Sequence, residues 1–151
     1  MSTNGWEPNR IEQRAVDIVD AIDRINRYLD GSSLEAFLKD DALQDAVARR
    51  LDVIGIAIKA IEKLESDGNV PSNERLAERS PDVGWRQAAG MRNRLNKEYG
   101  SVHPRIVWDT VYDNLPALRV AIIAAYPLIL SDRSETDDDQ PGDGKLGRAP
   151  R

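Results

Sequence analysis

Apolar residues recur at steps of three and four along residues 10–30, and this spacing constrains the fold more than any other feature. The apolar positions are Ile11, Ala15, Ile18, Val19, Ile22, Ile25 and Leu29. Such residues share one face of an amphipathic helix. Residues 41–67 repeat the pattern with Leu43, Val47, Leu51, Ile54, Ile58, Ile61 and Leu64. Two long helices joined by a short connection pack antiparallel, so the sequence predicts a helical bundle.

The remaining pattern is also helical. It predicts further elements at residues 34–39, 73–79, 83–99, 104–115 and 118–127. Ser33 is a suitable N-cap for the first of these, and the polar, proline-containing stretch 68–81 reads as a loop around the second. No alternating run of strand length occurs. The predicted fold class is therefore all-α, an antiparallel bundle of four main helices plus short helices.

Composition divides the chain into two parts. A length of 151 residues with 40% hydrophobic residues suits one domain of ordinary size. Residues 131–151 contain a single large aliphatic residue, Leu146. Such a segment cannot bury enough apolar surface to offset its ordering entropy. We expect a helical domain at residues 1–130 and a disordered polar tail at 131–151.

Several classes of protein are excluded by what the chain lacks. It has no cysteine, which rules out disulfides and thiolate metal sites, and one histidine, His103, which argues against a histidine metal centre. We expect no metal and no cofactor. No apolar run approaches the length of a membrane span, and residues 1–10 lack the features of a signal peptide. These features predict a soluble cytoplasmic protein without membrane association.

Charge is distributed unevenly. The net charge of −5 argues against a nucleic-acid-binding surface that covers the whole protein. Residues 86–105, however, carry one acidic side chain, Glu98, against five basic ones, Arg86, Arg92, Arg94, Lys97 and Arg105. This local excess indicates either a solvated helix face or a site for an anion.

The end of the predicted helix 83–99 carries residues that suit phosphate binding. Arg92 and Asn96 are four residues apart and share a helix face, whereas Lys97 lies about 140° around the helix from Arg92. If Arg92 and Lys97 bind one phosphate, the helix end must be distorted or a second subunit must contribute. Arginine binds phosphate oxygens, and Tyr99 could stack on a base. A charged helix end with Tyr99 covering the core also fits this pattern.

Short segments along residues 10–130 match one known family in its order. These segments are 18–25, 33–40, 45–47, 50–55, Trp85, 88–95, 106–111 and 115–116. Each is weak alone, but their order and spacing are specific. The chain resembles the HepT-like branch of the HEPN superfamily, the RNase toxins of HepT–MntA toxin–antitoxin pairs. The resemblance implies a HEPN-type helical bundle.

The family's catalytic signature is an arginine, four residues, a histidine, one residue and a tyrosine. Arg92 and Tyr99 match it, and Lys97 occupies the histidine position. The resemblance implies a metal-independent endoribonuclease, in which the ribose 2′-OH attacks the adjacent phosphate. It also implies a homodimer that brings two Arg92 motifs to one cleft. RNA, with tRNA as one candidate, would contact Arg92, Asn93, Arg94 and Asn96.

Lys97 decides how much activity the resemblance can carry over. Histidine transfers protons well because its ordinary pKa is about 6.5, whereas lysine, at about 10.4, is almost fully protonated at pH 7. Lowering a lysine pKa by about three units costs roughly 4 kcal/mol. The positive charges of Arg92 and Arg94 would also lower the pKa of Lys97, because like charges disfavour its protonated form. We expect this form to be inactive or weakened, and Lys97 is either natural or introduced. The alternative is a non-catalytic HEPN interaction module that binds a nucleotidyltransferase.

The resemblance also implies a partner, an MntA-like nucleotidyltransferase antitoxin that transfers AMP to Tyr99. His103 is expected in an exposed turn, without a catalytic role. Trp85 and Trp108 lie on apolar stripes and are expected in the core or in a dimer interface. Ile56 stands where relatives commonly have glutamate.

Overall fold

Two long antiparallel helices form one layer of the molecule. The computed structural model describes residues 9–90 and 103–138, with side chains described as far as Asp132. Helix α1 (Arg10–Leu29) begins at a capping box, in which Asn9 accepts from the Glu12 amide while the Glu12 carboxylate accepts from the Asn9 amide. Helix α3 (Asp41–Asp67) begins where the Asp40 carboxylate accepts from the Leu43 amide. Both helices were predicted from their apolar periodicity, and both are confirmed.

The predicted apolar stripes of α1 and α3 face each other in the core. Ile18, Ile25, Leu51, Ile54 and Ile61 are fully buried, and α1 and α3 form the most extensive contact between helices. The short helix α2 (Leu34–Leu38) joins them, with the Ser33 hydroxyl accepting from the Ala36 amide as expected. Gly31 has a φ of +79°, the left-handed conformation that favours glycine.

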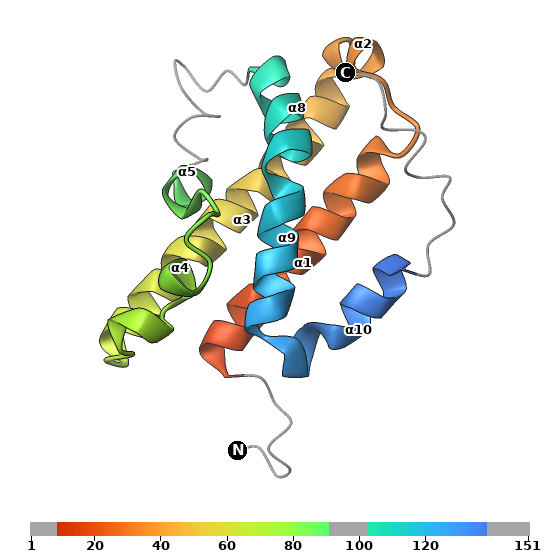
Figure 1. Ribbon diagram of the computed structural model, residues 1–151. Helices are drawn as coiled ribbons and strands as arrows, with labels where there is room; N and C mark the ends of the chain where they lie inside the picture. Colours follow the sequence, from red (N-terminus) through yellow and green to blue (C-terminus); the bar gives the residue numbers. More distant parts are fainter. Residues whose placement is uncertain (1–8, 91–102, 139–151) are drawn as a thin grey trace.

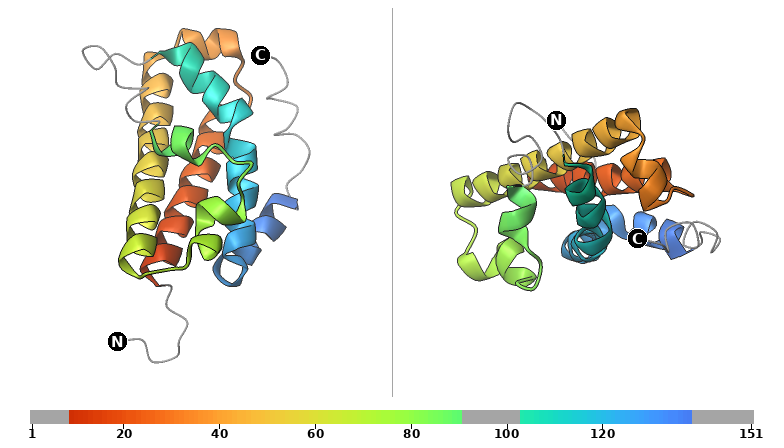
Figure 2. Two further views of the ribbon diagram at one scale, coloured as in Figure 1. Left: turned by 60° about the vertical axis from the view of Figure 1, so that its left-hand side comes forward. Right: turned by 90° about the horizontal axis from the view of Figure 1, so that it is seen from above.

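Helices α8 (Pro104–Asp113), α9 (Leu115–Ala125) and α10 (Pro127–Asp138) lie over this pair as a second layer, visible in Figures 1 and 2. Trp108 of α8 is fully buried, and its ring lies 5.4 Å from Phe37 and 4.6 Å from Tyr112. Arg119 of α9 donates to the Asp23 carboxylate of α1 over 2.7 Å. Ring packing therefore fixes α8, and a partly buried ion pair joins α9 to α1.

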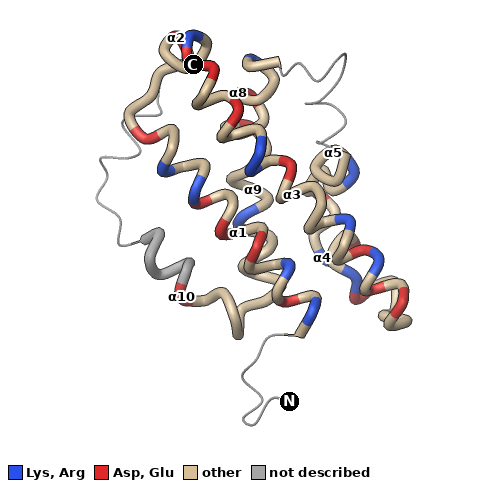
Figure 3. Tube along the Cα trace, turned by 180° about the vertical axis from the view of Figure 1, so that it is seen from behind, with Lys and Arg blue, Asp and Glu red and all other residues tan. Residues whose placement is uncertain are grey.

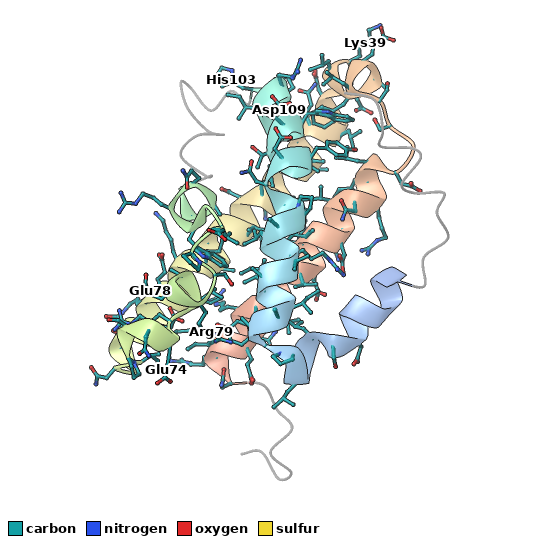
Figure 4. All side chains as sticks on the ribbon, in the orientation of Figure 1. Lys39, Glu74, Glu78, Arg79, His103 and Asp109 are labelled. Atoms are coloured by element: carbon teal, nitrogen blue, oxygen red, sulfur yellow. The ribbon has the colours of Figure 1, made fainter. Side chains whose placement is uncertain are left out.

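The segment after α3 forms short helices beside the second layer: η1 (Ser72–Glu74), α4 (Leu76–Arg79) and α5 (Trp85–Ala89). The predicted turn at 73–79 is thus confirmed. The buried Glu65 carboxylate accepts from the Leu76 amide over 2.7 Å, and burial is the main cause of its raised pKa. Arg79 reaches from α4 to the end of α9, where it donates to the Ala125 carbonyl (Figure 4).

Two predicted helix boundaries are wrong. The sequence favoured one helix from 83 to 99, but α5 ends at Ala89 and Gly90 is its C-cap with a ψ of 4°. The last helix was expected to end at Pro127, yet a new helix begins there and its backbone continues to Asp138. Proline suits the first turn of a helix, and neither proline nor glycine follows before Pro141.

The all-α fold is confirmed for the described residues, which contain no strand. The division at residue 130 stays a prediction: the α10 backbone extends beyond that boundary, and residues 139–151 lie outside the description. No helix within 9–90 or 103–138 has the length and apolar character required to cross a membrane.

Candidate functional site

The short helix α5 precedes the predicted motif in the chain. Trp85, the first residue of α5, is held in place by burial and by a hydrogen bond. Trp85 is 6% exposed, and its indole Nε1 donates to the Ser80 carbonyl over 2.8 Å. Ala88 and Ala89 are also buried. The expectation that Trp85 and Trp108 are core residues is confirmed. A single-turn helix would be marginal alone, so these contacts fix its position.

Gly55 of α3 provides the second contact with α5. A Cβ atom built on Gly55 would lie 3.2 Å from the Ala88 carbonyl oxygen and 3.3 Å from the Ala89 carbonyl oxygen. Glycine therefore allows the end of α5 to approach α3 backbone to backbone. Arg92 follows Ala89 by three residues, so this contact fixes the point from which the motif segment begins.

The predicted site residues themselves lie outside the described residues. They are Arg92, Asn93, Arg94, Asn96, Lys97 and Tyr99. The structure describes the two positions that bracket them, Gly90 at the end of α5 and His103 at the start of α8. Both α5 and α8 pack against α3. The motif segment is therefore tethered at both ends to elements that share the α3 core.

His103 is placed as expected. It is exposed and serves as the N-cap of α8, where its side chain makes no capping hydrogen bond (Figure 4). Arg105, the second residue of α8, donates to the Asp109 carboxylate one turn further along over 3.2 Å, and neither side chain is buried. This ion pair offsets the positive charge of Arg105, one of the five basic residues within 86–105.

The surface of the described residues carries both basic and acidic side chains, so it is not uniformly basic. Arg49 and Arg86 are exposed and Arg50 is half-buried, near the contact between α3 and α5. Along α1 and α3 basic and acidic residues are intermixed, as Figure 3 shows. Ile56 is 43% exposed beside Gly55. Half of the local positive excess of residues 86–105 belongs to the motif segment, and Arg86 and Arg105 supply the other half.

A pocket that the sequence did not indicate lies between α5 and the junction of α8 and α9. Its volume is about 120 Å³. Exposed polar side chains form its rim, namely Asp82, Gln87, Asp113 and Asn114. Mainly apolar residues, among them Leu115 and Leu118, form its floor. We call this the acidic pocket. No sequence motif joins Asp82 to Asp113, because only the packing of α5 beside α8 brings them together.

Comparison with known proteins places the chain in a family. The family model described as "Ribonuclease HepT-like" matches residues 18–125, which is more than half of the sequence. The chain belongs to the HepT-like ribonuclease family. The matched range includes α1 from residue 18 onward, all of α3, α5, α8 and α9, and the motif segment. The resemblance inferred from the ordered segments is confirmed.

Individual relatives within the HepT-like family agree. "Putative RNase TTE0752" of Caldanaerobacter subterraneus is 39% identical over 88 residues, which cover 58% of this chain and 69% of the relative. "Probable ribonuclease HepT" of Thermococcus cleftensis is 36% identical over 104 residues, 68% of this chain and 84% of the relative. "Putative RNase MJ0127" of Methanocaldococcus jannaschii is 32% identical over 66% of this chain and 74% of the relative. No solved structure gives a significant match.

Proposed function

We propose that this HepT-like protein is the toxin component of a HepT–MntA-type toxin–antitoxin system in the cytoplasm, with the scaffold of a metal-independent RNA endonuclease. The observation that carries the proposal is the family match over residues 18–125, a range that contains the Arg92, Lys97 and Tyr99 series. Lys97 stands at the histidine position of the family signature. This form therefore binds RNA and cleaves it weakly or not at all.

The chemistry proposed for the motif divides among its side chains. The Arg92 guanidinium stabilises the negative charge that develops on the phosphate as the 2′-OH attacks. Asn93, Arg94 and Asn96 contact the RNA backbone. A protonated Lys97 neutralises phosphate but cannot accept the proton from the 2′-OH. The backbone contact of α5 with Gly55 supports this assignment, because a catalytic arginine requires a fixed starting point.

We further propose that the active unit is a homodimer. Arg92 and Lys97 are about 140° apart on an ideal helix, so one copy presents them to one phosphate only if the helix end is distorted. A second copy supplies the missing group without distortion. Ile56 of α3 is 43% exposed and follows Gly55, which contacts α5, so it offers apolar surface for such an interface.

The proposed partner is an MntA-like nucleotidyltransferase antitoxin that attaches AMP to Tyr99. The added phosphate would occupy the basic cluster next to Arg92 and exclude RNA. The test is incubation of this protein with the nucleotidyltransferase and ATP, followed by peptide mass spectrometry. AMP on the Tyr99 peptide, and its loss in Tyr99→Phe, is the expected result. An unmodified Tyr99 in the presence of an active transferase would remove this part of the proposal.

The second candidate function is a non-catalytic HEPN interaction module. Lys97 is the observation that favours it, because the proton-transferring residue is missing. The two candidates differ in RNA affinity. The toxin scaffold should bind tRNA without metal, and Arg92→Ala with Arg94→Ala should weaken binding and reduce its salt dependence by about one or two phosphate contacts. A folded protein without measurable tRNA binding would favour the interaction module.

A further inference from the structure

The acidic pocket combines an apolar floor with rim side chains that are open to a ligand. Among the described residues, the side chains of Asp82, Gln87 and Asn114 make no hydrogen bond or ion pair. Asn114 is the N-cap of α9, a position where asparagine usually bonds to the helix, yet it makes no capping hydrogen bond. Asp113 already has an interaction partner, so we assign it no ligand contact. One carboxylate and two amides are therefore available at the rim.

Gly84 makes room for one of these amides at the edge of the pocket. A Cβ atom at position 84 would lie 2.8 Å from the amide oxygen of Gln87, which is closer than such atoms approach in proteins. Both residues line the pocket. Because glycine has no side chain, the Gln87 amide can fold back over this position. Its oxygen and nitrogen are thus held at the rim.

The size and lining of the pocket favour a single ring system. Its volume of about 120 Å³ lies below the range of roughly 300–1,000 Å³ typical of drug-sized ligands. Apolar surface comes from Val83, Ala88, Leu115 and Leu118. Unpaired bases of RNA are held in this way, against apolar side chains and with polar side chains bonded to their edges. The carboxylate of Asp82 repels phosphate, so the pocket suits a base and not the RNA backbone.

Asp82 determines which bases fit. An ionised carboxylate only accepts hydrogen bonds. Adenine, cytosine and guanine carry an exocyclic amino group that donates them, whereas uracil carries carbonyl oxygens in place of that group. A uracil oxygen at Asp82 would face a second acceptor. The amides of Gln87 and Asn114 both donate and accept, so they can bond to the neighbouring ring atoms of either kind. The rim therefore favours a base with an amino group.

The pocket lies close along the chain to the proposed RNA-binding residues. Gln87 and Ala88 belong to α5, which ends at Ala89. Arg92 follows Ala89 by three residues, a span of at most about 11 Å. A phosphate at Arg92 and a base in the acidic pocket can therefore belong to one short stretch of RNA.

We propose that the acidic pocket binds one unpaired base of the RNA and selects a base with an exocyclic amino group. Asp82 accepts from the amino group, and Gln87 and Asn114 bond to the edge of the ring. This inference rests on the proposed RNA-binding function. It adds a base preference that the motif cannot supply through phosphate, because phosphate contacts carry no sequence information.

Nucleosides test the pocket separately from the motif, because they carry no phosphate. Cytidine and uridine have nearly the same shape, and cytidine has an amino group where uridine has a carbonyl oxygen. Each is titrated into the isotope-labelled full chain, and NMR follows the side-chain amide signals of Gln87 and Asn114. The dissociation constant of cytidine should be at least about fivefold lower than that of uridine. Equal constants, or no shift with either nucleoside up to about 20 mM, would overturn the proposal.

Matched variants separate the pocket from a general effect of charge. Asp82→Ala should bring the dissociation constant of cytidine to that of uridine. Asp45→Ala, which removes an exposed carboxylate of α3, should preserve the difference. Gln87→Met should weaken cytidine binding about threefold or more, as loss of a hydrogen bond requires. Gln13→Met, the same change at an exposed position of α1, should leave binding unaltered. If Asp82→Ala keeps the preference for cytidine, Asp82 does not select the base.

Oligonucleotides extend the test to RNA. A uridine oligonucleotide with one central cytidine should bind at least about fivefold more tightly than the same length of uridine alone, and Asp82→Ala should abolish this ratio. Equal affinities of the two oligonucleotides would overturn the selection of an RNA base. Selective binding of free cytidine without binding of either oligonucleotide would confirm the base site and refute the RNA-binding function proposed above. The two failures are thereby distinguishable.

Discussion

Gly55 of α3 and Ala88 of α5 are so close that a Cβ atom at position 55 would lie 3.2 Å from the Ala88 carbonyl oxygen. Neither partner in this contact is a flexible side chain, so α5 must move if position 55 becomes larger. Arg92 follows Ala88 by four residues. The contact therefore relates the packing of α3 directly to the geometry of the proposed site.

Gly55→Val should displace α5 and lower the free energy of unfolding by about 1–3 kcal/mol, the usual cost of an overpacked contact. It should also weaken tRNA binding, because the motif segment begins at the displaced helix. Urea unfolding and a tRNA-binding titration measure the two effects. The control is Ala42→Val, the same side chain introduced at an exposed position of α3, which should change stability by less than about 0.7 kcal/mol. Unchanged stability in Gly55→Val would refute the contact.

Glu65 should make stability depend on pH in a direction opposite to that of most carboxylates. Burial raises its pKa above 4.5, so the folded state holds the proton more tightly than the unfolded state does. The free energy of unfolding should therefore fall as pH rises from about 4.5 through the raised pKa, and stay level above it. Glu65→Gln should remove this slope. Thermal unfolding from pH 4 to pH 8 measures it.

The control for that series is Asp45→Asn, which removes an exposed carboxylate from the same helix and should keep the slope of the unaltered protein. Tyr126, which lies near Glu65, should give a second pH dependence of stability at higher pH. Burial, followed by the nearby Glu65, raises the pKa of Tyr126 to about 12. The tyrosine should therefore ionise above its ordinary value near 10 in absorbance titrations, and stability should decline between those two pH values. Ionisation near pH 10 in the folded protein would contradict the packing described.

Arg119 and Asp23 join α9 to α1, with Arg119 only 12% exposed. Arg119→Met should destabilise the protein by about 1–3 kcal/mol, because it leaves Asp23 partly buried without its cation. Asp23→Asn in the same background should recover part of that loss. A double-mutant cycle of chemical unfolding gives the coupling energy, and a coupling of zero would show that the pair contributes nothing.

His103→Ala, made in the Lys97→His background, should leave the rate of RNA cleavage unchanged. His103 is exposed, caps α8 without a side-chain hydrogen bond, and lies beyond the predicted signature. Rates of tRNA cleavage at pH 7 measure the effect. A loss of tenfold or more would mean that His103, rather than residue 97, transfers the proton.

Local signals predicted the long elements well and their boundaries less well. The three-and-four spacing identified α1 and α3, and Ser33 identified the start of α2, because those signals act within one or two turns. The break at Gly90 was missed, although glycine often follows the end of a helix, because the apolar pattern was read as continuing through it. Helix α10 was missed because Pro127 was read as the end of a helix, whereas proline also suits a first turn and a new helix begins there.

Sequence reasoning likewise found one part of the candidate site and missed another. The ordered segments identified the family, which the comparisons confirm, and the signature positions can be read directly from the sequence. The acidic pocket could not be found in this manner, because Asp82 and Asp113 are brought together only by tertiary packing. The roles of Arg92, Lys97 and Tyr99 stay predictions. The role of Lys97 can be tested directly by measuring RNA cleavage.

That test is cleavage of a total tRNA pool, without metal, by the protein as it stands and by Lys97→His side by side. Intact mass should first show that Tyr99 carries no AMP, and circular dichroism should show that both proteins are folded. Lys97→His should cleave tRNA at least about a hundredfold faster, the usual contribution of a general base, and adding Arg92→Ala should abolish that activity. Equal cleavage by both proteins, or none by a folded Lys97→His, would contradict the proposed role of residue 97.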